Sequence, residues 1–142
     1  MSISPEHVGR CYPATAPYEV SRAKIAEFAR ALGDTNPAYF GDDPIAPPTF
    51  AAVIAAQAWG ALFADPDLGL ALMRTVHADQ GFAYSRPLRP GDQVIATLTI
   101  DKVRQRGSLD WIGISVALTV GGERVCTATS TLLHTRQEQE DA

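Results

Sequence analysis

The stretch TFAAVIAAQAWGALFA, residues 49–64, decides the fold of this chain. All of its residues are apolar except Thr49, Gln57 and Gly60, and the apolar side chains lie all round a helical wheel rather than on one face. A helix of this kind must be buried on nearly every side. Its many alanines are small, so a sheet could approach it closely. The sequence therefore predicts a central helix that other elements surround.

After this helix the pattern changes to the two-residue period of β-strands. Apolar and polar side chains alternate through three runs, and a last strand is rich in Thr and Val. These runs are residues 76–84, 94–100, 112–120 and 124–133. Gly121 and Gly122 form a typical two-residue hairpin turn between the last two. One central helix followed by three or four long antiparallel strands predicts an α+β hot-dog fold, in which a curved sheet wraps around the helix.

A second, shorter helix is predicted ahead of the central one. Ser21 is a typical N-cap, one apolar stripe follows at helical spacing, and Gly33 ends the helix. The length of 142 residues fits one domain. We expect the hot-dog domain to span residues 1–135 and the charged tail, residues 136–142, to be disordered.

The composition limits the partners. The net charge is −4, from 12 basic and 16 acidic residues, which argues against nucleic acid or an anionic membrane because both demand a concentrated positive field. Some cations crowd one stretch, which allows a local basic patch, although solvated strand ends and turns are the plainer interpretation. These cations are Arg86, Arg89, Lys102, Arg104 and Arg106.

Nothing in the sequence indicates secretion, a membrane span or a cofactor. No basic segment followed by an apolar run opens the chain, and no apolar stretch is long enough to cross a bilayer. Cys11 and Cys126 have no CxxC or His neighbours, so we interpret both as small buried hydrophobes in a reducing compartment. No His, Cys and Asp cluster has metal-ligand spacing. The sequence predicts a cytoplasmic protein without a metal or other cofactor.

The loop between the two helices, Gly33-Asp34-Thr35-Asn36-Pro37-Ala38-Tyr39, contains the candidate chemistry. It has a plain structural use, because the Asp34 carboxylate can accept backbone N–H groups in an Asx-turn and Pro37 stiffens the chain. It also resembles the motif Gly-Asp-x-Asn-Pro-x-His of the MaoC-like (R)-specific hydratases and dehydratases. The resemblance implies an Asp and His acid–base pair, with Asp34 as the first member. Tyr39 stands at the His position, and a phenol titrates near ~10 rather than near ~6.5, so it is a poor general base.

The start of the central helix departs from the same family. There the resemblance implies backbone N–H groups that hold the thioester oxygen. Pro47 and Pro48 supply no N–H, so we expect the amides of Thr49 and Phe50 to form a weakened oxyanion hole.

Most of the chain resembles one branch of that family. The segments VGRCYPATAPYEV, IAPPTF, VHADQGFAYSRPLRPGD and TATSTLL, which start at residues 8, 45, 76 and 127, are similar to the N-terminal MaoC-like dehydratase domain family. That family includes accessory subunits of heteromeric (3R)-hydroxyacyl-ACP dehydratases. The chain is shorter than these relatives around residues 41–43, which puts in doubt any lid over an acyl tunnel.

Three functions remain open at this point. The resemblance favours an accessory subunit that binds the acyl chain of an acyl-ACP or acyl-CoA thioester and forms a heterodimer with a catalytic hot-dog subunit. The alternatives are a self-sufficient homodimeric hydratase or dehydratase that uses Asp34, and a non-catalytic acyl-thioester binder or scaffold. A hot-dog thioesterase is a more distant fourth. In every case we expect at least a dimer.

The candidate site residues follow from these hypotheses. Asp34 and Tyr39 form the vestigial catalytic pair, and the expected substrate-binding residues are Asn36, Thr49, Phe50, Ile54 and Trp59. Strand alternation places His77 on the face opposite Val76, Phe82 and Tyr84 and on the same face as Asp79. We interpret His77 as structural or as a hydrogen-bonding residue at an interface.

Overall fold

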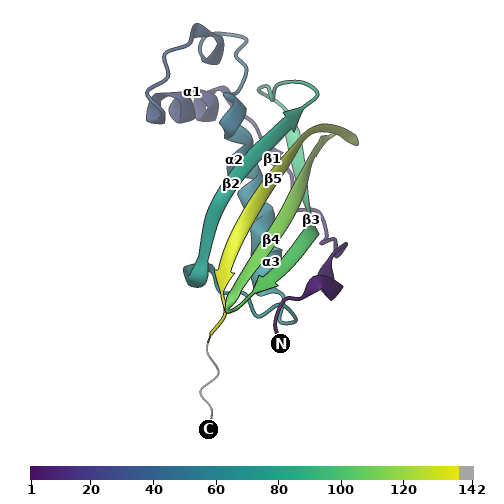
Figure 1. The fold of residues 1–142 in the computed structure, drawn as a ribbon. Helices are drawn as coiled ribbons and strands as arrows, with labels where there is room; N and C mark the ends of the chain where they lie inside the picture. The colour runs from purple at the N-terminus through teal and green to yellow at the C-terminus, as the bar shows by residue number, and fades with distance from the viewer. Residues whose placement is uncertain (138–142) are drawn as a thin grey trace.

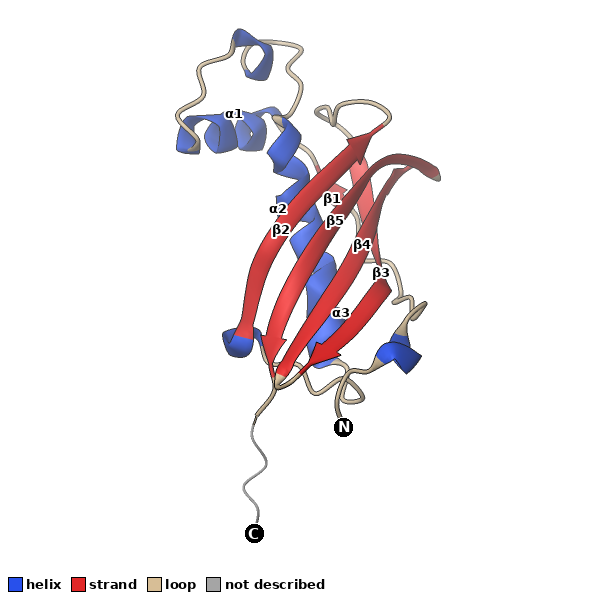
Figure 2. Ribbon diagram, in the orientation of Figure 1, coloured by secondary structure: helices blue, strands red, loops and turns tan. Residues whose placement is uncertain are grey.

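A five-stranded antiparallel sheet curls around one helical segment, as Figures 1 and 2 show. The computed structural model describes residues 1–137. The strand order is β1-β3-β4-β5-β2. The strands are β1 (Tyr18–Glu19), β2 (Thr75–Tyr84), β3 (Gln93–Arg106), β4 (Leu109–Val120) and β5 (Glu123–Thr135). The predicted α+β hot-dog fold is confirmed.

The alternation of side chains along β3 and β4 creates the core face of the sheet. Leu98 lies opposite Val116 and Ile100 lies opposite Ile114, and all four are buried against the helix. The register shifts between Ile100 and Lys102, at a β-bulge that leaves one residue of β3 unpaired. Beyond the bulge, Val103 of β3 and Ile112 of β4 again face the core.

The central helical segment runs without interruption from Pro48 to Ala64. It consists of η3 (Pro48–Phe50), α2 (Ala51–Ala55), η4 (Ala56–Ala58) and α3 (Trp59–Ala64). Phe50, Ile54 and Leu62 are fully buried. The prediction of burial on nearly every side is wrong, because the sheet covers only one side of this segment. Side chains spaced along the other side are exposed, among them Thr49, Val53, Gln57 and Ala61.

Shorter helices flank this pair of layers. Helix α1 (Arg22–Ala31) begins as predicted, since the Ser21 hydroxyl accepts the amide of Lys24 at 3.1 Å. It ends at Gly33, whose φ of +70° is the left-handed conformation that favours glycine. The Phe28 ring packs edge-on against Phe50 with centroids 5.4 Å apart, so α1 is joined to the helix start. The remaining short turns are η1 (Pro5–His7), η2 (Pro37–Tyr39) and η5 (Leu72–Arg74).

A second bulge lies in β2, where the register with β5 shifts between His77 and Asp79. His77 pairs with Leu132 and Phe82 pairs with Ala128, and both partners are buried in the core. His77 therefore shares the inner face with Phe82 and lies on the opposite face from Asp79. The prediction for His77 is right about Val76 but wrong about the other three positions, because strict alternation does not survive an extra residue.

Polar contacts fix the N-terminal segment to the far end of the helix. The Arg10 guanidinium pairs with Asp65 at 2.8 Å and with Asp67 at 3.0 Å, and the Tyr12 hydroxyl donates to Asp65 at 2.6 Å. Hydrogen bonds from Tyr12 and Arg10 hold the pKa of Asp65 below its usual range despite partial desolvation. These bonds join the segment before β1 to the residues that end α3.

The remaining sequence predictions can now be placed. Cys126 is buried as expected, whereas Cys11 is exposed, because the segment before β1 lies on the surface. The Arg136 amide donates to the Ser108 carbonyl at 2.8 Å. Residues 138–142 of the expected tail lie outside the described residues. Within residues 1–137, no helix is long and apolar enough to cross a membrane.

Candidate functional site

The loop from Gly33 to Tyr39 is held by its own side chains. The Asp34 carboxylate accepts the amide of Asn36 at 2.9 Å, and the Asn36 side chain accepts the amide of Ala38 at 3.0 Å. Both are Asx-turn bonds, which is the structural use expected from the sequence. The second bond also caps η2, the turn that presents Tyr39. Asp34 therefore positions the loop, and its hydrogen-bond partner is the Asn36 backbone amide rather than Tyr39.

Tyr39 lies in a pocket where the loop, the start of the central helix and the end of β2 meet. The pocket has a volume of about 370 Å³, within the range of small-molecule sites. Its lining is mostly apolar and consists of Tyr39, Ile45, Ala46, Pro48, Tyr84, Ser85, Arg86 and Pro87. Tyr39 is half-buried there and packs against the core.

Tyr84 also lines this pocket and was not predicted as a site residue. Its hydroxyl donates to the Pro48 carbonyl, so it joins the end of β2 to the first helical turn. Burial, with the Cys126 thiol close by, raises the pKa of the Tyr84 phenol. The phenol therefore stays protonated at neutral pH and serves as a hydrogen-bond donor. Its position at the end of an apolar strand was the only sequence signal for this role.

Arg86 contributes a charge to the pocket wall, but that charge is already paired. Its guanidinium forms a two-pronged ion pair with Asp92, at 2.9 and 3.1 Å, and donates to the Pro87 carbonyl at 2.9 Å. Asp92 also accepts the Arg89 amide at 2.9 Å. Burial opposes ionisation of Asp92, but these donors outweigh it and lower its pKa. This pair stabilises the turn before β3.

The start of the central helix has fewer free amides than predicted. The Phe50 amide donates to the Pro47 carbonyl at 2.9 Å, so it is engaged within the first turn. Of the two expected oxyanion donors, Thr49 alone remains a candidate. The prediction of a weakened oxyanion hole stays a prediction, with one donor in place of two.

The expected substrate-binding residues fall into separate places. Asn36 and Thr49 are exposed near the loop pocket, whereas Phe50 and Ile54 are fully buried core residues. Trp59 lies ten residues along the helix from Thr49, about 15 Å at the usual helical rise. The structure thus brings Tyr39 close to the helix start but leaves Trp59 in a second location.

Trp59 belongs to a second polar group on the inner face of the sheet. Its ring packs edge-on against His77, with centroids 5.0 Å apart, and its indole nitrogen is buried without a partner within the described chain. His77 Nε2 lies 3.1 Å from the Gln80 side-chain oxygen, which also accepts the Ser130 hydroxyl. The bulge in β2 assembles this group, so the sequence pattern did not reveal it.

Within residues 1–137, no group of three or more His, Cys, Asp or Glu side chains could hold a metal ion.

Comparisons with known proteins identify a family. The model of the family described as FAS1-like, dehydratase domain region matches residues 6–128. A UPF0336 protein of Cutibacterium acnes is 59% identical over 139 residues, covering 97% of this chain and 98% of that protein. A UPF0336 protein of Streptomyces coelicolor is 43% identical over 149 residues, covering 98% of this chain and 99% of that protein.

Solved structures agree with these matches. One is the C-terminally truncated HadBC complex, a 3R-hydroxyacyl-ACP dehydratase of Mycobacterium tuberculosis, with a TM-score of 0.78, 29% identity and coverage of 89% of this chain and 96% of that chain. Another is a MaoC-like dehydratase, with a TM-score of 0.82, 26% identity and coverage of 92% of this chain and 42% of that chain.

Proposed function

Because this chain belongs to the FAS1-like dehydratase region family and to the UPF0336 proteins, we propose that it is the accessory, acyl-chain-binding subunit of a (3R)-hydroxyacyl-thioester dehydratase. The loop pocket carries this proposal. Among the described residues that line it, no side chain is a carboxylate or an imidazole. The Tyr84 phenol is a poor general base because its pKa is raised, and the Arg86 guanidinium is paired with Asp92.

The pocket is nevertheless suited to binding. Its walls are largely apolar, and two phenol rings and two prolines border it, which favours a hydrocarbon chain over a polar substrate. Phe50 and Ile54 anchor the adjoining helix in the core. In this proposal the pocket holds part of an acyl chain whose reacting carbons lie against a base supplied by a partner.

Two features indicate where the partner subunit binds. Strand β2 is an edge strand, paired on one side to β5 and open on the other within residues 1–137. Proteins cover such edges because unpaired strand groups attract other chains. Large apolar side chains gather near this edge and on the uncovered side of the helix, and are exposed: Val53, Leu72, Met73 and Val76. A second hot-dog subunit that extends the sheet at β2 would cover both.

The HadBC relative is itself a complex of two different subunits, which supports a heteromeric arrangement here. In a heterodimer the partner would supply the Asp and His pair that this chain lacks, while this chain supplies the pocket wall around Tyr39 and Tyr84. A cytoplasmic location accords with the proposal, since thioester substrates and the free thiols of Cys11 and Cys126 both suit a reducing compartment.

A hydration assay tests the proposal. The purified chain, a candidate catalytic hot-dog subunit and their mixture are each given crotonyl-CoA and a longer trans-2-enoyl-CoA. We expect no turnover from this chain alone and a gain in the mixture, larger for the longer substrate. Turnover by the chain alone, abolished by Asp34→Asn, would refute the accessory role and favour the self-sufficient enzyme. Substrate binding without turnover in any mixture would favour a non-catalytic binder.

A further inference from the structure

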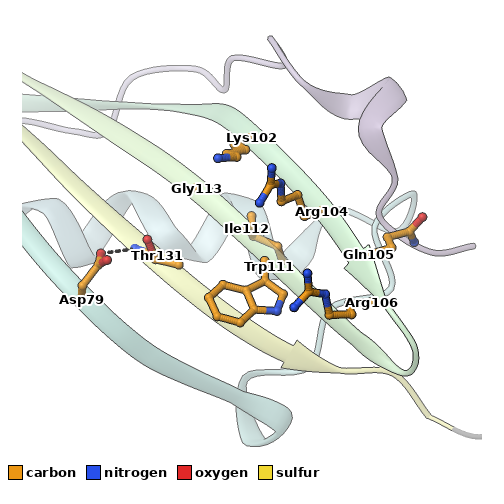
Figure 3. A pocket seen from close by; sticks show the side chains of 9 residues that line it. All are labelled: Asp79, Lys102, Arg104, Gln105, Arg106, Trp111, Ile112, Gly113 and Thr131. Atoms are coloured by element: carbon orange, nitrogen blue, oxygen red, sulfur yellow. Dashed lines mark hydrogen bonds between the residues drawn. The ribbon is translucent and has the colours of Figure 1, made fainter.

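A cationic groove lies on the face of the sheet that points away from the central helix, as Figure 3 shows. Its volume is about 540 Å³, and Lys102, Arg104 and Arg106 of β3 line one side of it. Trp111 and Gly113 of β4 form its floor and adjoining wall. The groove lies on the other face from the residues that line the loop pocket.

The bulge in β3 turns the three cations to the outer face of the sheet. The register shift between Ile100 and Lys102 places Val103 in the core, so its neighbours point outward. Lys102, Arg104 and Arg106 then occupy successive alternate positions on one face. At about 3.3 Å per residue, the column of these three cations spans about 13 Å from first to last.

The charges of this column are not neutralised within residues 1–137. The ion pairs of the described chain involve other cations, and all three side chains of the column are exposed. Asp79 lies across the groove, but its carboxylate accepts the Thr131 amide at 2.9 Å. A positive column on a chain of net charge −4 indicates an anionic partner.

An apolar strip lies directly beside the column. The register places Arg104 opposite Trp111, and Trp111 opposite Leu133. Trp111 is 41% exposed although it is a large aromatic residue. The neighbouring position is Gly113, where a Cβ atom would lie 3.2 Å from the Lys102 Cβ, so the absence of a side chain hollows the groove. Tryptophan and arginine together are the residue types that dominate protein interfaces.

We propose that this groove docks an acidic amphipathic helix of a partner protein. Three carboxylates at every fourth position of a helix extend over about 12 Å along its axis. This length is close to the span of about 13 Å covered by the three cations of the column. A helix about 10 Å across would also cover two neighbouring strands, which lie about 4.8 Å apart, and place an apolar stripe on Trp111 and Leu133. A small polyphosphate ligand would engage the cations but leave that strip exposed. This surface is independent of the proposed dehydratase role.

The test uses a stapled helical peptide of about five turns, with Glu at every fourth position and Leu on the adjoining stripe. Binding to the full chain is followed by calorimetry and by tryptophan fluorescence, to which Trp59 and Trp111 both contribute. The matched peptide has Gln in place of each Glu. The double variant Arg104→Glu with Arg106→Glu is compared with Arg22→Glu with Lys24→Glu, which changes the net charge equally at exposed positions of α1. Thermal unfolding confirms that each variant is folded.

We expect the Glu peptide to bind the wild-type chain, more weakly as NaCl rises from about 50 to about 300 mM. Affinity should fall about tenfold or more in the β3 double variant and by less than about twofold in the α1 variant. Failure of the Glu peptide to bind the wild-type chain would overturn the proposal, as would equal binding of the Gln peptide or equal losses in both variants. Displacement of the peptide by micromolar ADP would also overturn it, because the groove would then be a nucleotide site.

Discussion

Replacing Tyr84 by Phe tests how the loop pocket is held together. The Tyr84 hydroxyl donates to the carbonyl of Pro48, 36 residues earlier in the chain, and its raised pKa keeps it a donor at neutral pH. Tyr84→Phe keeps the ring and removes only this bond. An orphaned buried acceptor costs about 1–3 kcal/mol, but Pro48 is exposed and water can partly replace the donor, so we expect about 1 kcal/mol. That loss should lower the Tm by about 3–4 °C.

Urea unfolding followed by circular dichroism measures this loss, with Tyr18→Phe as the matched control. The Tyr18 ring also packs at the helix start, 6.3 Å from Phe50 between centroids, but its hydroxyl makes no hydrogen bond within the described chain. We expect the control to match the wild type. A Tyr84→Phe value within about 0.3 kcal/mol of the wild type, or equal losses in the two variants, would show that the bond to Pro48 does not hold the pocket.

Three further predictions concern stability. The native pKa of Asp65 is lowered, chiefly by the Tyr12 hydroxyl, so its contribution to the free energy of unfolding is present above about pH 4 and is lost as the pH falls through the native pKa. Lowering the pH should therefore destabilise the wild type more than Asp65→Asn. Parallel stability curves of the two proteins against pH would contradict this. Arg86→Lys keeps the charge but loses the two-pronged ion pair with Asp92. Urea unfolding should show that the free energy of unfolding falls by about 1 kcal/mol. An unchanged free energy of unfolding would argue against the two-pronged geometry. Leu62→Ala truncates a fully buried side chain and should lower the free energy of unfolding by about 2–5 kcal/mol in the same assay. A loss under about 1 kcal/mol would mean that the core refills the cavity.

The sequence predicted the fold well because the fold depends on repeating patterns. The all-apolar run of residues 49–64 and the alternation after residue 75 leave few architectures, and local signals at Ser21 and Gly33 mark the ends of α1. Bulges interrupt such patterns without a local signal. The extra residue in β2 therefore reversed the predicted facing of His77.

The candidate site was harder to predict because it depends on contacts between distant segments. The Asx-turn of Asp34 is local and was expected, whereas the bond from Tyr84 to Pro48 joins two elements that only the folded chain brings together. The same limit applies to the buried pair of Asp110 and His134. His134 Nδ1 lies 3.3 Å from the Asp110 carboxylate, and its Nε2 accepts the Ala71 amide at 3.1 Å, although nothing in the sequence near His134 indicates burial.

The exposed side of the central helix and the incomplete pocket have a common explanation in the proposed function. A self-sufficient enzyme needs a base and an oxyanion donor pair in its own pocket, but here Tyr39 replaces the expected His and the Phe50 amide is engaged with Pro47. Both departures fall at the same place, where the loop meets the helix start. The apolar lining is retained, and within residues 1–137 β2 has an unpaired edge that a second subunit could extend. A chain that keeps an apolar binding pocket but lacks the expected His and one of two expected amide donors is what the proposed division of labour between two hot-dog subunits would produce.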